Sequence, residues 1–295
     1  MSGIFVDRTG LSDSERRREI FDGNIFLTSP RSSVAALTGL AESMIGEGFS
    51  QTDPRKAQFD LPVEEFVSII GPLKTRFTNH PRTKDLVREV LSDFGCELDK
   101  TYFDVPRLRI VTHGGYLTSG VGYAYRPHRD IWYSSPSCQV NWWVPVYSLE
   151  IEQTLVLYPN YWNRRVRNSS SKFDYDEWCR SGRQQAVSQI QVDTRNHPLA
   201  EEEISSDSEL RLVCNAASTI AFSSAHLHAT APNNSGLTRF SLDFRTVNWD
   251  DLRSGKGAPN IDSAATGTTI GDFIRASDFS PISEELIEPD LLLRK

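Results

Sequence analysis

The strongest constraint on the fold is a change of sequence pattern near residue 101. Before this point, apolar residues recur at helical spacing. After it, short runs of alternating, β-branched and aromatic residues are separated by clusters of Gly, Pro, Asn and Ser. These runs cover residues 107–111, 139–146, 154–158, 218–222 and 239–245. Short strands bounded by turn residues are typical of an all-β sandwich or barrel, so we expect a mainly β fold.

The first hundred residues predict helices. Ser12 and Glu15 have capping-box spacing and open a short helix that ends near Gly23. Three further apolar patterns of helical spacing cover residues 34–45, 62–70 and 86–94. We expect these helices to pack against a sheet rather than to form a separate domain.

One domain over residues 1–295 is therefore expected, with three parts. Residues 1–100 form a helical buttress and residues 101–250 form the β core. Residues 160–210 interrupt that core with a polar insertion, which carries a short helix around 175–180. Residues 251–295 form a C-terminal arm, in which 253–270 read as flexible and 283–295 as a short docking helix.

Charge and cysteine content exclude several classes of protein. The net charge of −7 is opposite in sign to that of a typical duplex nucleic-acid binder. No apolar run approaches the roughly 18 residues of a membrane span, and no signal-peptide pattern opens the chain. The four cysteines form no CxxC pair, which argues against a disulfide framework or a structural zinc site. We expect a cytoplasmic protein without nucleic-acid or membrane partners; the oligomeric state stays open.

The residues that point to chemistry are His128, Asp130 and His228. His128 and Asp130 are two positions apart, so on an extended chain their side chains point to the same side. An isolated HxD pair is also compatible with a solvated turn that contains a local His–Asp hydrogen bond. His228 follows the predicted strand at 218–222 and can supply a third ligand. Two imidazoles and one carboxylate on one face of an octahedral ion are the ligands of non-haem Fe(II) oxygenases.

A second motif strengthens this interpretation. Arg239 and Ser241 lie on the last predicted strand, eleven residues after His228, and share one strand face. A guanidinium fork beside a hydroxyl suits a buried carboxylate. HxD, a later His and Arg-x-Ser together are far more specific than any one of them.

Over residues 105–247 this combination resembles the Fe(II)/2-oxoglutarate-dependent oxygenase superfamily, and most closely its phytanoyl-CoA-dioxygenase-like branch. The resemblance implies a double-stranded β-helix, a jelly roll related to cupins, with helices buttressing one sheet. It implies that His128, Asp130 and His228 bind Fe(II), while Arg239 and Ser241 hold the distal carboxylate of 2-oxoglutarate. Dioxygen is then the second co-substrate, and a small molecule is hydroxylated or desaturated, with specialised-metabolite biosynthesis as the expected context. The sequences at Trp132-Tyr133 and over residues 139–145 differ from those of phytanoyl-CoA enzymes. The resemblance therefore leaves the substrate undetermined.

Further pocket residues are predicted from their positions on strands and near the HxD motif. Asn141 lies on the same face of its predicted strand as Gln139 and Trp143. It either contacts the co-substrate or is a hydrogen-bonded core amide. The candidates for substrate contact are Trp132, His113, Trp143 and Arg245. Each also has a plain structural interpretation, which for Arg245 is pairing with a carboxylate. His226 is interpreted as a packing residue, and residues 160–167 as either a lid or a solvated loop.

Two other functions stay open, and one reaction is disfavoured. A cupin-type metal enzyme that does not use 2-oxoglutarate would not need Arg239 and Ser241. A non-enzymatic jelly-roll binding module would not need the complete ligand set. In the resembling superfamily, halogenating members carry a small residue in place of the ligand carboxylate. Asp130 occupies that position and predicts oxygenation or desaturation.

Overall fold

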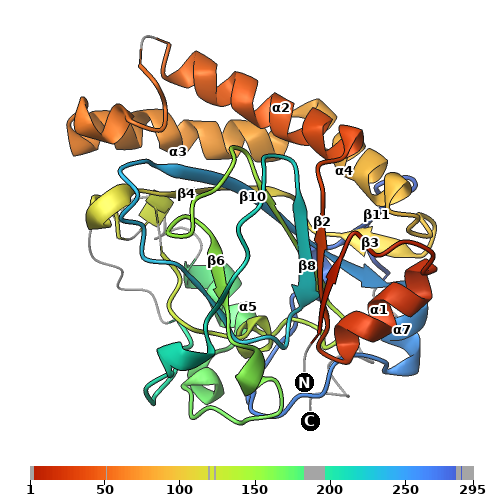
Figure 1. Cartoon of the computed structure of the whole chain (residues 1–295). Coiled ribbons are helices and arrows are strands. Elements are labelled where there is room, and N and C mark those ends of the chain that lie inside the picture. The colour runs from red at the N-terminus through yellow and green to blue at the C-terminus, as the bar shows by residue number, and fades with distance from the viewer. Residues whose placement is uncertain are drawn as a thin grey trace.

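Two β-sheets form the centre of the computed structural model, which describes residues 3–50, 52–118, 120–122, 124–182, 197–283 and 287 (Figure 1). The 8-stranded sheet has the order β1-β2-β8-β5-β10-β3-β11, with β4 also paired to β10. Its strands are β1 (Ile4–Val6), β2 (Ile25–Thr28), β3 (Thr101–Phe103), β4 (Arg107–Val111), β5 (Val140–Pro145), β8 (Thr219–Ser223), β10 (Arg239–Asn248) and β11 (Ile274–Arg275). The 3-stranded sheet has the order β7-β6-β9, with β6 (Leu155–Leu157), β7 (Leu210–Arg211) and β9 (His228–Thr230).

The long strand β10 organises the larger sheet. Its first half pairs with β4 and its last residues with β3, while β5 runs antiparallel along its other edge. Side chains alternate along it as the pleat requires. Phe240, Leu242 and Phe244 are buried in the main hydrophobic core, whereas Arg239 and Asp243 line a cavity on the opposite face.

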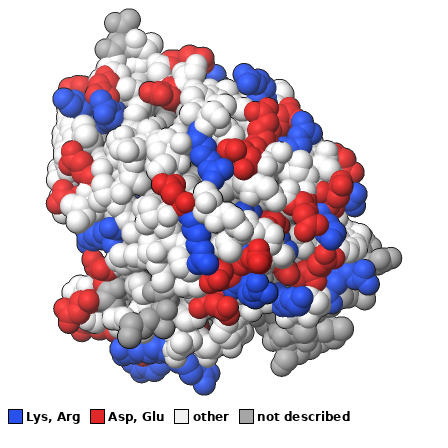
Figure 2. Space-filling view, turned by 45° about the vertical axis from the view of Figure 1, so that its right-hand side comes forward, with Lys and Arg blue, Asp and Glu red and all other residues white. Residues whose placement is uncertain are grey.

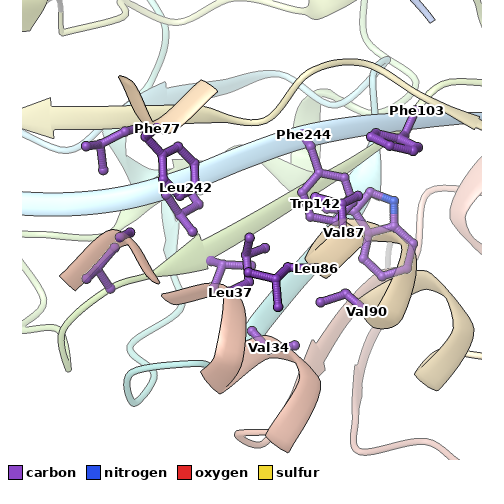
Figure 3. Close-up of a cluster of buried hydrophobic side chains, with 14 of the residues drawn as sticks. Val34, Leu37, Phe77, Leu86, Val87, Val90, Phe103, Trp142, Leu242 and Phe244 are labelled. Carbon is purple, nitrogen blue, oxygen red and sulfur yellow. The ribbon is translucent and has the colours of Figure 1, made fainter. Parts of the chain in front are cut away.

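Helices cover the core face of this sheet. They are α1 (Asp13–Phe21), α2 (Ser32–Gly48), α3 (Val63–Asn79) and α4 (Pro81–Asp93). In Figure 1, α2, α3 and α4 lie along one side of the sheet. In Figure 3, apolar side chains of α2 and α4 meet those of the central strands: Val34, Leu37, Leu86, Val87 and Val90 against Trp142, Leu242 and Phe244. Each fully buried Leu or Val contributes about 1.5–3 kcal/mol relative to exposure, so this layer anchors the sheet.

The two sheets also pack on one another. Trp143 and Phe222 of the larger sheet join Leu155 and Leu157 of β6 in one buried apolar cluster. This cluster closes one end of the space between the sheets. The cavity described below occupies the remainder of that space.

Most predicted elements are confirmed, and some expectations are wrong. The capping box of Ser12 and Glu15 is present, and the predicted strands coincide with β4, β5, β6, β8 and β10. The N-terminal hundred residues are not purely helical, because β1 and β2 extend the larger sheet and β2 pairs with β8. These two strands were not predicted from the sequence pattern, because strands of three and four residues show too little alternation.

The segment 253–270 is packed rather than free. It follows α7 (Trp249–Ser254), and its residues Ala258, Ala265 and Ile270 are buried. The short helix expected around 175–180 appears as α5 (Tyr175–Glu177) and a following π-helical turn. The docking helix expected over 283–295 lies outside the described residues, apart from Ser283 and Ile287.

Within the described part of the chain, no helix is long and apolar enough to cross a membrane. Figure 2 shows acidic and basic side chains interspersed over the face that it presents.

Candidate active site

The local backbone brings His128, Asp130 and His228 together. Arg129 between the first two is extended, with φ −112° and ψ 142°, so His128 and Asp130 point to one side. His128 forms an antiparallel bridge with His228, and each backbone N–H donates to the other's carbonyl at 2.9 Å. This bridge extends the smaller sheet by one position at its β9 edge.

The ligand atoms of these three residues lie within 4.8 Å of one another. The Nε2 atoms of His128 and His228 are 3.5 and 3.8 Å from Asp130 Oδ1. Each Nδ1 is held by a backbone carbonyl, that of Arg126 at 2.8 Å for His128 and that of His226 at 3.0 Å for His228. A Nδ1–H that donates to a carbonyl leaves Nε2 with the lone pair, which is the form that binds a metal.

Two amides orient the carboxylate. Asn141 Nδ2 donates to Asp130 Oδ2 at 2.7 Å, and Gln139 Nε2 donates to the same atom at 3.3 Å. Asp130 Oδ1 therefore faces the histidines while Oδ2 is occupied. Of the two alternatives for Asn141, the hydrogen-bonded amide is present, because its nitrogen donates to Asp130. Asn141 also lines the cavity, and its contact with the co-substrate stays a prediction.

Electrostatics keep Asp130 and His228 in the protonation states that bind a metal. Burial opposes the ionisation of Asp130, but its hydrogen bond with His128 and the positive charge of Arg245 favour it, and its pKa is held well below its usual value. Burial and the neighbouring His128 lower the pKa of His228 to about 4. At neutral pH the site therefore presents an anionic carboxylate and a neutral His228, as metal ligation requires.

A cavity of about 550 Å³ opens at these ligands between the two sheets. Its floor is the face of β4, β5 and β10 opposite the helices, and Trp143 lies there. The opposite wall is formed by aromatic residues of the insertion and of the turn after Asp130. The volume is in the range of small-molecule sites.

Arg239 enters this cavity as a buried cation without a carboxylate partner in the described chain. Its Nη1 donates to the carbonyls of Gln153 and Thr154 at 3.2 and 3.4 Å. Its Nε and the Oγ of fully buried Ser241 have no partner among the described residues. Burial lowers the pKa of Arg239 to about 10, which leaves it charged at neutral pH. These orphaned donors fit a ligand carboxylate.

Two predicted substrate residues are brought to the cavity. The Trp143 ring lies 5.5 Å from the Arg239 guanidinium carbon. Arg245 also lines the cavity, and it pairs with Asp104 at 3.0 Å. Asp104 is itself buried, so this is not a surface ion pair.

Trp132 and His113 do not line the cavity, and their placement there is corrected. The chain turns into a 3₁₀ helix, η4 (Asp130–Tyr133), directly at Asp130. Three residues complete one turn of such a helix, so Tyr133 and not Trp132 returns to the side of Asp130. Trp132 is fully buried elsewhere and donates from Nε1 to Asp262 at 2.8 Å. His113 lies in a turn after β4, where its Nδ1 accepts from the N–H of Gly236.

His226 is a packing residue, as expected. It is fully buried, its Nε2 lies 2.9 Å from the carbonyl of Gly23, and its ring is 4.6 Å from that of Trp162. Burial lowers its pKa to about 3. The segment 160–167, weighed as a lid, is packed beside it: Tyr161, Trp162 and Val166 are buried and do not line the cavity.

Sequence reasoning missed most of the aromatic wall. It consists of Tyr125, Tyr133, Phe173, Tyr175, Trp178 and His197. Phe173, Tyr175 and Trp178 lie in the insertion, which has no strand or helix period long enough to assign a face. Only the density of aromatic residues in a polar segment could have suggested a role.

No protein-family model and no curated protein matches this chain. Several solved structures are similar to it. EvdO2 from Micromonospora carbonacea var. aurantiaca, complexed with 2-oxoglutarate, shares 10% identity over 59% of this chain and 62% of its own, with a TM-score of 0.37. The non-heme monooxygenase ThoJ shares 12% identity over 88% of both chains, with a TM-score of 0.41.

The epimerase SnoN, in complex with Fe3+, alpha ketoglutarate and nogalamycin RO, shares 12% identity over 88% of this chain and 98% of its own, with a TM-score of 0.39. The chain thus spans less than two thirds of EvdO2. One of these proteins is named a non-heme monooxygenase, and the structures of the other two contain 2-oxoglutarate. At TM-scores below 0.5 they carry no weight for the mechanism.

Proposed function

We propose that this protein is a non-haem Fe(II)/2-oxoglutarate-dependent oxygenase that acts on a small molecule. The observation that carries the proposal is one cavity with two matched features. His128, Asp130 and His228 offer three metal ligands at one point, and Arg239 offers an unpaired buried cation in the same cavity. In this proposal the two sheets are those of a double-stranded β-helix of the phytanoyl-CoA-dioxygenase-like branch.

The chain's own groups have defined tasks in this function. When bound, ferrous iron with 2-oxoglutarate and dioxygen supplies the oxidising power to attack an unactivated C–H bond. His128, Asp130 and His228 would hold the metal and leave part of its coordination sphere to other ligands. Arg239 and Ser241 bind the distal carboxylate of 2-oxoglutarate. Gln139 and Asn141 hold Asp130 in its ligating orientation, and the aromatic wall limits the access of water.

The presence of Asp130 sets the expected outcome of the reaction. Its Oδ1 faces both imidazoles, so a carboxylate fills the third protein position. We expect hydroxylation or desaturation and no halogenation, because that position is not open to a halide. Chlorinated product from the native protein in chloride buffer would contradict this assignment.

Anaerobic titration tests the proposal. Fe(II) and 2-oxoglutarate, added together without oxygen, should give a weak visible charge-transfer band that neither gives alone. In air, the protein should release succinate from 2-oxoglutarate, faster when a true substrate is present. His128→Ala should abolish the band.

The other outcomes identify the alternatives. Metal binding without a 2-oxoglutarate band would indicate a cupin-type metal enzyme. Absence of metal binding to the folded protein would indicate a non-enzymatic binding module. Either result overturns the proposed oxygenase.

A further inference from the structure

We propose that the substrate carries a carboxylate that binds to Arg107 and Arg245 on the cavity floor, beside the metal ligands. This inference rests on the proposed function for the reaction. Its ligand chemistry comes from the arrangement of charges on β4 and β10.

The cavity floor carries an unusual density of charge. β4 and β10 are antiparallel neighbours, with Ser241 opposite Arg109 and Asp243 opposite Arg107. Side chains that alternate on this face line the cavity: Arg107, Arg109, Arg239, Asp243 and Arg245. Four guanidinium groups therefore share one wall of the cavity. Arg239 is buried, whereas the side chains of Arg107 and Arg245 are 28% and 26% exposed, so an anion that enters the cavity can reach them.

Two of the four arginines are accounted for. Arg109 contacts Asp243 through two atom pairs, Nε–Oδ2 at 2.6 Å and Nη2–Oδ1 at 3.4 Å, which is the two-pronged geometry that matches both groups. Arg239 is assigned to 2-oxoglutarate under the proposed function. The remaining two are Arg107 and Arg245.

Arg107 and Arg245 share a single carboxylate. Both Nη1 atoms contact the same oxygen, Asp104 Oδ2, at 2.5 and 3.0 Å. The other oxygen, Oδ1, accepts from the backbone N–H of Arg245 at 2.7 Å. Asp104 is fully committed, and the Nε and Nη2 groups of both arginines have no partner in the described part of the chain. Asp243, which pairs with Arg109, is a further negative charge close to both arginines. The pair can therefore accept a second anion through its unused Nε and Nη2 donors, and not through an excess of positive charge.

The pair lies close to the metal ligands. Arg245 is the cross-strand partner of Asn141, which donates to Asp130. An anion bound at Arg245 would therefore lie on the strand next to Asn141, the residue that orients the Asp130 carboxylate.

The opposite wall suits the apolar part of such a substrate. The ring centroids of Tyr133 and Phe173 are 5.4 Å apart, and those of Phe173 and Trp178 are 5.9 Å apart. Asp272, on that same wall, accepts from the Tyr175 hydroxyl. An acidic group there disfavours an anion at the aromatic wall, so the carboxylate end is directed to the floor.

Matched acid and amide probes test this proposal. The protein is saturated anaerobically with Fe(II) and 2-oxoglutarate, so that Arg239 is occupied, and probe binding is measured by calorimetry. The pairs are cyclohexanecarboxylate with its amide, 3-phenylpropanoate with its amide, and 2-naphthoate with its amide. We expect at least one acid to bind about tenfold or more tightly than its amide, because hydrogen bonds to a charged group are worth that much.

Variants locate the preference. Arg107→Gln should bring the ratio of acid to amide affinity close to one, and Arg107→Lys should leave an intermediate ratio because it keeps charge without the fork. The matched control is Arg76→Gln, which removes an exposed ion pair with Glu47 far from the cavity and should keep the native ratio. Equal affinities within every pair, or an unchanged ratio in Arg107→Gln, would overturn the proposal.

The experiment separates this inference from the proposed function. A 2-oxoglutarate charge-transfer band without any preference for acids would refute the carboxylate subsite alone. An acid preference that depends on Arg107, in a protein without that band, would refute the oxygenase and retain the anion site.

Discussion

At the scale of single residues, the site depends on which atom of each side chain is already engaged. The histidine Nδ1 atoms and Asp130 Oδ2 are held by the protein, which leaves two Nε2 atoms and Oδ1 facing one point. The ligand set is therefore oriented before any metal binds. His226 is only two residues from His228, but its Nε2 contacts the carbonyl of Gly23 and is not available as a metal ligand.

Neighbouring histidines should respond differently to substitution. His228→Ala should abolish Fe(II) binding, because one of three ligands is lost. His226→Phe keeps the ring beside Trp162 and should retain Fe(II) binding, while the unpartnered carbonyl of Gly23 lowers the free energy of unfolding by about 1–3 kcal/mol. Metal titration and denaturant unfolding measure the two effects. Retained iron binding in His228→Ala would refute the ligand assignment.

Arg239 should control affinity for 2-oxoglutarate. Loss of one partner of a buried charge pair costs roughly 3–5 kcal/mol, so Arg239→Ala should weaken 2-oxoglutarate binding by a factor of hundreds or more. Arg239→Lys should be only partly active, because it keeps charge but loses the fork. Anaerobic titration of the charge-transfer band measures both. Native affinity in the alanine variant would contradict the assignment.

The amide of Asn141 should matter to the metal although it is not a ligand. Asn141→Leu preserves size and removes the donor to Asp130 Oδ2, and we expect Fe(II) affinity to fall by about 10- to 100-fold. Gln139→Met removes the longer contact and should have a smaller effect. Metal titration compares the two variants; an unchanged affinity in Asn141→Leu would show that Asp130 is oriented by other groups.

Which side chains meet at the site was predictable where the backbone is extended. The spacing of His128 and Asp130 correctly predicted that both side chains point to one side, because the backbone of Arg129 is in the β region. The same reasoning failed for Trp132, since η4 begins at Asp130 and a helix replaces the period of two by a period of three. The start of a four-residue 3₁₀ helix depends on tertiary contacts that a single sequence does not display.

At the scale of elements, strands with strong alternation were predictable and short ones were not. β10 has ten residues that alternate between the helix-covered core and the cavity, and its period is clear. β1, β2 and β9 have three or four residues, too few to show a period, and they are strands because neighbouring strands supply hydrogen bonds. Of the smaller sheet, the local pattern therefore predicted β6 but neither β7 nor β9.

Two glycines in different elements should respond in opposite directions to the same substitution. A Cβ at Gly257 would lie 2.6 Å from the carbonyl carbon of Ser137, on the turn that leads to β5. Gly257→Ala should destabilise by about 1–3 kcal/mol, as overpacking does. Gly39 is exposed in α2 with open space around it, and Gly39→Ala should stabilise by about 0.5–1 kcal/mol. Thermal unfolding of both proteins measures the signs; stabilisation by Gly257→Ala would contradict the packing of this segment.

At the scale of the whole molecule, Arg129 connects three distant segments. It lies between two metal ligands, but its side chain points away from them and is completely buried. Its Nε pairs with Asp262 at 3.0 Å, and its Nη2 donates to the carbonyls of Tyr161 and Arg164. The insertion and the C-terminal segment are thereby fastened to the backbone that carries His128 and Asp130.

Removal of Asp262 should weaken both the fold and the metal site. Asp262→Ala leaves the Arg129 charge buried without its partner and also removes the acceptor of Trp132, so we expect a loss of about 3–5 kcal/mol in the free energy of unfolding. Fe(II) affinity should fall as well. Asp278→Asn, which removes an exposed pair with Arg275, should change neither. Denaturant unfolding and metal titration check this, and a stable Asp262→Ala protein would show that Arg129 finds another partner.

The bridge between His128 and His228 also determines when, during synthesis of the chain, the three candidate metal ligands can meet. The two residues are about a hundred positions apart, and a ribosome adding 5–20 residues per second needs roughly 5–20 seconds to pass from one to the other. During that interval the nascent chain holds two of its metal ligands without the third. A metal that meets the chain then has only an incomplete site to bind. Under the proposed function, the complete metal site therefore forms only after the strand that carries His228 has been synthesised and has paired with His128.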